Sequence, residues 1–128
     1  MDVIIDASCV MSILLGEEES SVVRNKSSGL TLISSSCLPF EVGNSLTSAV
    51  KRHRLNAEII DEVFREFLKM PIRLIEPNIE KALKIAAEEN HYAYDAYYIE
   101  CALSRGIPLF SLDNGLIEIA KKRGVKCL

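Results

Sequence analysis

The sequence predicts an α/β protein, a three-layer α/β/α sandwich in which a central parallel sheet carries helices on both faces. Two observations lead to this prediction. Short runs of branched apolar residues alternate along the chain with longer helix-like segments, and strands that alternate with helices pair in parallel through right-handed crossovers. The first run, Val3-Ile4-Ile5, is apolar at three successive positions, as expected of a strand buried on both faces.

In the N-terminal half we expect strands at residues 3–5 and 30–34 and helices at residues 8–15, 17–25 and 39–54. Gly16 is a suitable end for the first helix. The second helix begins with acidic residues, which the helix dipole favours. Pro39 fits the first turn of the third helix, where its missing N–H costs little. Val42, Leu46, Ala49 and Val50 form the apolar side of that helix.

The clearest amphipathic helix covers residues 56–70, where Ile59, Val63 and Phe67 repeat every four positions. Asn56 is a suitable cap, and Pro71 prevents continuation. Beyond it we expect strands at residues 72–75, 108–112 and 124–128. We also expect helices opening at Pro77, covering residues 94–104, and running from Asp113 to Lys122. The inward residues expected in the first of these are Ile79, Ala82, Leu83 and Ala86.

Length and composition limit the class of protein. A chain of 128 residues predicts one domain, residues 1–128. No apolar run is long enough to span a bilayer, and no basic leader precedes the first apolar stretch, so we expect a cytoplasmic protein without membrane contact. The four cysteines form no close pair, which argues against a structural zinc site. A net charge of −3 gives no general attraction to nucleic acid.

Four acidic residues stand at the ends of strands or the starts of helices: Asp6, Glu41, Asp95 and Asp113. Each has a local explanation as a helix cap, a first-turn residue or a turn residue. Glu41 and Asp95, however, lie in otherwise apolar or aromatic segments, and a buried unpaired charge costs several kcal/mol, on the order of measured desolvation penalties. No Lys or Arg is close in sequence to Asp6, Glu41 or Asp113. Acids gathered at one sheet edge without counter-charges favour Mg²⁺ or Mn²⁺.

The chain resembles the PIN domain family, and within it the small stand-alone proteins of the VapC type, the toxins of toxin–antitoxin pairs. The likeness extends over essentially the whole length. It is carried by four motifs in order: VIIDAS at residues 3–8, LPFEVGNSL at residues 38–46, YDAYY at residues 94–98 and FSLD at residues 110–113.

This resemblance implies a metal-dependent endoribonuclease whose catalytic, metal-binding residues are Asp6, Glu41, Asp95 and Asp113, holding one or two Mg²⁺ or Mn²⁺ ions. Ser8 and Ser111 align with supporting hydroxyl residues, and Ser111 stands where many relatives carry Thr. A further acid sometimes found after the last Asp is absent, which leaves a second metal position open. Asn44, one helical turn after Glu41, is a candidate supporting donor. RNA is the implied substrate, and an antitoxin protein and a second copy of the chain are the implied partners.

The basic cluster Lys51-Arg52-His53-Arg54 either ends a helix in solvent, as the dipole favours, or contacts the RNA backbone through Lys51, Arg52 and Arg54. Most tyrosines at residues 92–98 are expected in the core or at an interface rather than stacked on bases. Neither His53 nor His91 has a sequence pairing that indicates a catalytic base.

Three other interpretations compete with the nuclease. A phosphoaspartate receiver needs adjacent early acids, a central aspartate and a late lysine that follows a strand. Here the first strand ends in the single Asp6, and the later apolar segments supply no matching lysine. A haloacid-dehalogenase phosphatase needs a second Asp two residues after the first, where this chain has Ser8. A catalytically silent PIN-like module that binds nucleic acid or protein stays open, although the complete set of four acids argues against it.

Overall fold

The computed structural model describes all residues from 1 to 128. It contains a parallel four-stranded sheet in the order β3-β2-β1-β4, formed by β1 (Asp2–Ile5), β2 (Thr31–Ser35), β3 (Ile72–Ile75) and β4 (Leu109–Phe110). In this sheet β1 lies between β2 and β4, with Ile4 opposite Ile33 on one side and Leu109 on the other. The first strand is therefore central.

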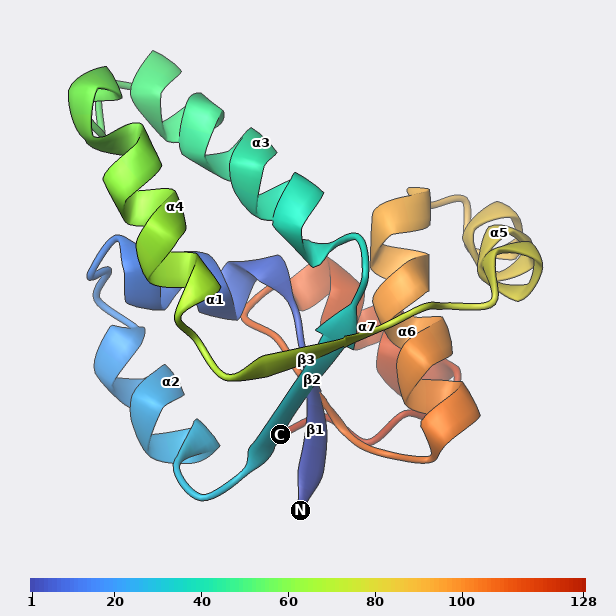
Figure 1. Cartoon of the computed structure of the whole chain (residues 1–128). Coiled ribbons are helices and arrows are strands. Elements are labelled where there is room, and N and C mark those ends of the chain that lie inside the picture. The colour runs from blue at the N-terminus through green and yellow to red at the C-terminus, as the bar shows by residue number, and fades with distance from the viewer.

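Seven α-helices and one 3₁₀ helix cover the sheet: α1 (Ala7–Leu14), α2 (Ser20–Ser27), α3 (Leu38–Lys51), η1 (Ala57–Ile59), α4 (Ile60–Leu68), α5 (Ile79–Glu88), α6 (Ala93–Arg105) and α7 (Asn114–Lys122). Helices α1 to α4 lie on one face, and α5 to α7 lie on the other, shown left and right of the sheet in Figure 1. The predicted three-layer α/β/α sandwich is confirmed.

Each face of the sheet has its own apolar core. Val3, Ile5 and Phe110 pack with residues of α1 to α4, whereas Ile4 and Leu109 pack with residues of α5 to α7. Side chains alternate between the two faces of a strand, so a strand covered on both sides tends to be apolar at successive positions. Val3, Ile4 and Ile5 are all fully buried, which is why the first strand shows no polar alternation.

Local sequence sets many of the element ends. Asp6, Asn56, Asn78 and Asp113 each accept a backbone N–H as the N-cap of the helix that follows. Gly106 ends α6 with φ of 63°, in the left-handed region that glycine adopts at little cost. These short polar and glycine residues fix the connections between layers.

Three expectations about the elements were wrong. The strand predicted at residues 124–128 is a single bridge between Leu109 and Cys127, because β4 itself is only two residues long. The helix predicted from residue 17 begins at Ser20, after an exposed acidic turn. Ile79 and Leu83, expected to face inward, are exposed, because α5 packs on the core through Ala82, Ile85 and Ala86.

None of the helices is long and apolar enough to span a lipid bilayer.

Candidate active site

The polar ends of the strands open into a cleft of about 480 Å³. Asp6 directly follows β1, Asp113 follows β4 after two residues, Glu41 lies in the first turn of α3 after β2, and Asp95 lies in the first turn of α6. All four carboxylates line this cleft. Because the strands are parallel and β1 lies between β2 and β4, residues far apart in the sequence meet at one edge.

Asp6 forms the floor of the site and is only 4% exposed. Its Oδ1 accepts the Ser8 hydroxyl at 2.6 Å and the Cys9 N–H at 3.3 Å, and its Oδ2 accepts the Ser111 hydroxyl at 2.6 Å. The two serines in turn accept the backbone N–H groups of Leu112 and Asp113, each at 2.9 Å. The hydroxyls predicted to support the site therefore tie the end of β1 to the loop after β4.

Glu41 is held by Tyr98, which sequence reasoning did not single out. The Tyr98 hydroxyl of α6 donates to Glu41 Oε1 across the cleft edge. Burial and the neighbouring Glu41 charge raise the pKa of the Tyr98 phenol, so the hydroxyl keeps its proton and remains a donor. Tyr98 is 1% exposed, which excludes the base-stacking role considered for the tyrosines at this position.

Asp95 is held by His91, a contact that the sequence analysis did not include. His91 Nε2 and Asp95 Oδ2 form a hydrogen bond, although His91 precedes α6. The spacing of four residues is the one sequence feature that could have indicated this contact, although His91 lies outside the helix. Tyr92 and Tyr94 are exposed and remain outside the core.

Asp113 has two roles in the structure. Its Oδ1 accepts the N–H groups of Gly115 at 2.9 Å and Leu116 at 3.3 Å, so it caps α7, where the local explanation was an ordinary turn. It also lines the cleft beside the other three acids. Gly115 leaves little room at this cap, because a Cβ there would lie 3.3 Å from Asp113 Oδ1. The local and the functional explanations of this residue are compatible.

Burial is the main reason that the pKa values of Asp6, Glu41 and Asp95 are raised above their usual range. The charge of Asp113 raises all three further, and Asp6 and Asp95 also raise the pKa of Glu41. Hydrogen bonds from Ser111, Tyr98 and His91 act in the opposite direction. No Lys or Arg forms an ion pair with any of the four acids. The site is a concentration of negative charge held by neutral donors and one histidine.

The remaining candidate residues differ in position. Asn44 lies on the cleft wall, and no hydrogen bond joins its side chain to the acids. Arg52 and Arg54 line the outer part of the same cleft, whereas Lys51 and His53 are exposed and do not line it. The structure thus brings two of the three predicted RNA-contacting cations to the cleft.

The donor set fits a hard divalent cation, because four carboxylates with mutual repulsion offer the oxygen ligands that Mg²⁺ and Mn²⁺ prefer. As the side chains stand, no three Asp, Glu, His or Cys residues are close enough together to ligate one ion. The acids share a cleft without forming a ready coordination sphere, since each one is turned toward a hydrogen-bond donor of the protein.

Comparison with known proteins gives a consistent result. The family model of the PIN domain matches residues 3–122. The fold is similar to PAE2754 from Pyrobaculum aerophilum, with a TM-score of 0.74 and 20% identity over 99% of this chain and 83% of that one. No curated protein matches the sequence.

Two further structures share the fold at low identity. VapC20 of Mycobacterium tuberculosis, a toxin that cleaves the sarcin–ricin loop, has a TM-score of 0.68 and 12% identity over 91% of this chain and 93% of that one. VapBC2 from Rickettsia felis, bound to a DNA fragment from its promoter, has a TM-score of 0.67 and 13% identity over 100% and 98%. The match of the family model to residues 3–122, with which the shared fold agrees, identifies the chain as a member of the PIN domain family, whose proteins are generally nucleases that use divalent metal ions.

Proposed function

We propose that this protein is a metal-dependent endoribonuclease that hydrolyses RNA phosphodiester bonds. The observation that carries the proposal is the cleft in which Asp6, Glu41, Asp95 and Asp113 meet without an ion pair to any Lys or Arg. Repulsion among these carboxylates lowers the stability of the folded protein, and a bound cation that prefers oxygen ligands offsets that loss. The family membership supports the same class of chemistry.

The four carboxylates would hold one or two Mg²⁺ or Mn²⁺ ions as the catalytic residues of the site. A bound ion of this kind lowers the pKa of a coordinated water and stabilises charge on the phosphoryl and leaving oxygens. Ser8 and Ser111 orient Asp6, and Tyr98 and His91 orient Glu41 and Asp95. Asn44 on the cleft wall is free to donate to a ligand or to the substrate.

We further propose that Lys51, Arg52 and Arg54 contact the RNA backbone. All three are exposed, and none of them forms an ion pair within the chain. Cations of this kind at the mouth of an acidic cleft would attract the strand and make RNA binding depend on salt concentration.

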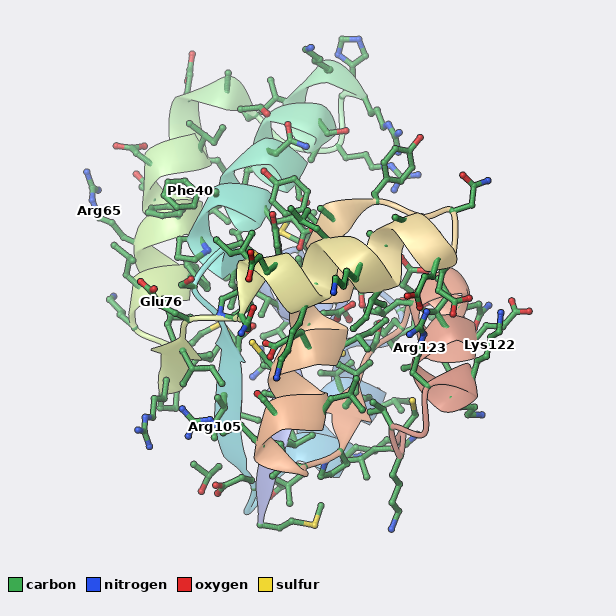
Figure 2. All side chains as sticks on the ribbon, turned by 90° about the vertical axis from the view of Figure 1, so that its right-hand side faces the viewer. Phe40, Arg65, Glu76, Arg105, Lys122 and Arg123 are labelled. Carbon is green, nitrogen blue, oxygen red and sulfur yellow. The ribbon has the colours of Figure 1, made fainter.

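We also propose that the chain, as a single domain, is a cytoplasmic toxin of the VapC type. Its partners in this proposal are an antitoxin protein and a second copy of the chain. The likeness to VapC20 and to VapBC2 supports the first partner. Exposed apolar side chains support the second: Phe40 at the start of α3 is 77% exposed (Figure 2), and Ile79 and Leu83 of α5 are 55% and 48% exposed.

The test is cleavage of assorted RNAs by the purified protein with Mn²⁺, with Mg²⁺ and with a chelator. Cleavage should require a metal and should be lost in Asp6→Asn. Asp61→Asn is the matched control, because Asp61 is exposed on α4 and paired with Arg65 far from the cleft, so this variant should cut normally. Metal-independent cleavage or an active Asp6→Asn variant would refute the proposal. Tight RNA binding without cleavage under any metal would favour the silent binding module instead.

A further inference from the structure

The cleft continues beyond the four acids as a trough between α1 and α3, which lie against each other above the sheet edge (Figure 1). Successive helical turns of each helix supply its walls, at spacings of three or four residues that keep side chains on one face. Residues that line this α1–α3 trough include Met11 and Ser12 of α1, Ser45, Ser48 and Ala49 of α3, and Leu15 and Arg52, which cap the C-termini of the two helices. Three of them are serines and one is an alanine, and these small side chains leave the trough open.

Ser12 carries an unsatisfied polar atom in this wall. The residue is 1% exposed, and its hydroxyl is the one buried side-chain polar atom in the protein without a hydrogen-bond partner. The buried Ser34, by contrast, donates to the Ile5 carbonyl at 2.6 Å. A serine within a helix usually bonds a carbonyl of the preceding turn or faces water, and a buried hydroxyl that does neither costs free energy. Because Ser12 lines the trough, its hydroxyl is a candidate donor to a ligand that lies there.

The outer end of the trough carries charges of both signs. Arg52 and Arg54 line it on the α3 side, and Glu17 and Glu19 line it from the turn between α1 and α2. None of these four residues is in an ion pair, so the guanidinium groups are available to an anion and the carboxylates would repel one. The charges therefore favour an anionic group that lies against α3.

We propose that the α1–α3 trough is a second subsite, which binds a backbone phosphate of the RNA strand away from the bond that is cut. Ser12 supplies a neutral hydroxyl donor, Arg52 and Arg54 supply the charges, and Glu17 and Glu19 keep the strand on the α3 side. Glu41 and Arg52 are eleven residues apart on α3, or about 16 Å along the helix axis. This separation is several times the rise of about 3.4 Å per nucleotide that one strand makes along a duplex axis, so Arg52 would meet a phosphate other than the one that is cut. The inference rests on the proposed function, because it assumes that the anion is part of an RNA chain.

The first test measures binding of a fluorescently labelled single-stranded RNA by anisotropy in a chelator, where the strand stays intact, over a range of salt concentrations. The logarithm of affinity falls with the logarithm of salt concentration, and each phosphate contact contributes about 0.7 to that slope for single strands. Arg52→Gln and Arg54→Gln should each reduce the slope by about this amount. Arg105→Gln is the matched control, because Arg105 is exposed at the far end of α6 from Asp95 (Figure 2) and should leave the slope unchanged.

The second test isolates the neutral donor. Ser12→Ala should weaken RNA binding about 2- to 10-fold, the range expected for one hydrogen bond, with the salt slope unchanged because no charge is lost. The melting temperature should stay the same or rise, since the hydroxyl has no partner to lose. Ser21→Ala on the exposed side of α2 serves as the control. A Ser12→Ala variant that keeps its melting temperature and binds RNA as tightly as wild type would overturn the role of Ser12.

The third test uses the opposite charges. Glu17→Gln and Glu19→Gln should tighten RNA binding, because each removes a repulsion between a carboxylate and the phosphates.

Two results would show that the trough is not a phosphate subsite. In the first, both arginine variants leave the salt slope of RNA binding unchanged. In the second, a cationic peptide binds to the protein and Glu17→Gln weakens that binding. A protein that cuts RNA with an unchanged slope in the arginine variants would refute this inference and keep the nuclease. A protein that shows the predicted slopes yet never cuts would refute the nuclease and keep the subsite.

Discussion

The protein holds two groups of acidic side chains that differ in how their charge is balanced. At the junction of α5 and α7, Glu89 accepts Lys122 Nζ and Arg123 Nε, both at 2.8 Å, and Glu88 accepts the Arg123 guanidinium at 2.7 Å. Lys122 and Arg123 project from the end of α7 toward these acids in Figure 2. At the sheet edge, Asp6, Glu41 and Asp95 meet two serines, a tyrosine and a histidine instead.

The pKa directions follow this difference. Hydrogen bonds and charge from Lys122 and Arg123 lower the pKa of Glu89, whereas burial raises the pKa values of Asp6, Glu41 and Asp95. The first group stabilises the contact between two helices. Asp6, Glu41 and Asp95 have no Lys or Arg to balance their charge, and perturbed pKa values of this kind are typical of functional sites. Acidic residues alone thus do not mark a site. Several buried acids that share one cleft without a Lys or Arg partner are the distinguishing observation.

The largest effect should come from Asp95→Asn. Removing one of four proposed ligands should lower the affinity for Mn²⁺ by at least about tenfold, because even residues that only support metal ligands contribute 10- to 100-fold. Isothermal titration calorimetry with Mn²⁺ measures this change. Glu88→Gln, which removes an acid from the α5–α7 junction, should leave the affinity unaltered. Equal Mn²⁺ binding by wild type and Asp95→Asn would show that the two groups of acids do not differ in the proposed way.

Tyr98→Phe should have the next largest effect. The variant keeps the buried ring and removes the donor to Glu41, so Glu41 loses its fixed orientation. We expect RNA cleavage to fall about 10-fold, at the low end of the range for residues that support metal ligands. Tyr94→Phe, at a half-exposed position of the same helix, is the control. The measurement is the single-turnover cleavage rate at saturating and at limiting Mn²⁺. If excess Mn²⁺ restores the rate of Tyr98→Phe, the substitution has weakened metal binding.

The melting temperature without metal should depend on pH in opposite directions for the two groups. The pKa values of Asp6, Glu41 and Asp95 are near 4 in the unfolded protein and are raised in the folded protein. Between these two values the folded protein binds more protons than the unfolded protein. The stability contributed by these groups therefore falls as pH rises through that interval. Glu89, with its lowered pKa, loses its stabilising effect as pH falls below its ordinary value.

Thermal melts in chelator from pH 3 to pH 8, with Glu41→Gln as the comparison, test this expectation. Glu41→Gln keeps an acceptor for Tyr98 and removes the charge, so at pH 7 it should melt about 3–5 °C higher than wild type, the shift that 1 kcal/mol produces in a domain of this size. Its fall in stability above pH 4 should also be shallower. A variant that melts lower at pH 7 would mean that the charge of Glu41 is balanced by a group that stabilises the fold.

The smallest effect should come from Glu89→Gln. This variant leaves Lys122 and Arg123 without their shared acceptor charge, and we expect the melting temperature to fall by a few degrees at low salt and by less at high salt. RNA cleavage should be unchanged. Thermal melts at two salt concentrations measure the effect. If Glu89→Gln lost RNA cleavage but kept its melting temperature, Glu89 would have a role in cleavage and not in the contact between α5 and α7.

The fold could be predicted largely because β1 is apolar at three successive buried positions and because short strands alternate with helices along the chain. Ile4 and Ile5 face opposite cores, and only a central parallel strand needs that pattern. The faces of the outer helices were harder to predict. Ile79 and Leu83 have the spacing of a buried face, yet small residues such as Ala82 and Ala86 make the contacts of α5.

The hydrogen bonds within the site could not be predicted to the same degree. Glu41 and Tyr98 are 57 positions apart, and nothing in either segment indicates that they meet. His91 lies outside the helix that carries Asp95, so a pattern based on helical faces does not cover it. The unpartnered hydroxyl of Ser12 depends on its surroundings in three dimensions, which a pattern of residue types does not contain.

Helix α6 carries Asp95 at one position and Tyr98 a single turn later, so one rigid body sets the orientation of two acids from different parts of the chain. A shift of α6 along its axis would change both the distance between Asp95 and Asp6 and the hydrogen bond from Tyr98 to Glu41. Helix α6 also packs against α5, on which Ile79 and Leu83 are exposed among charged residues. A partner that bound α5 and displaced α6 would therefore change the positions of Asp95 and Tyr98 together.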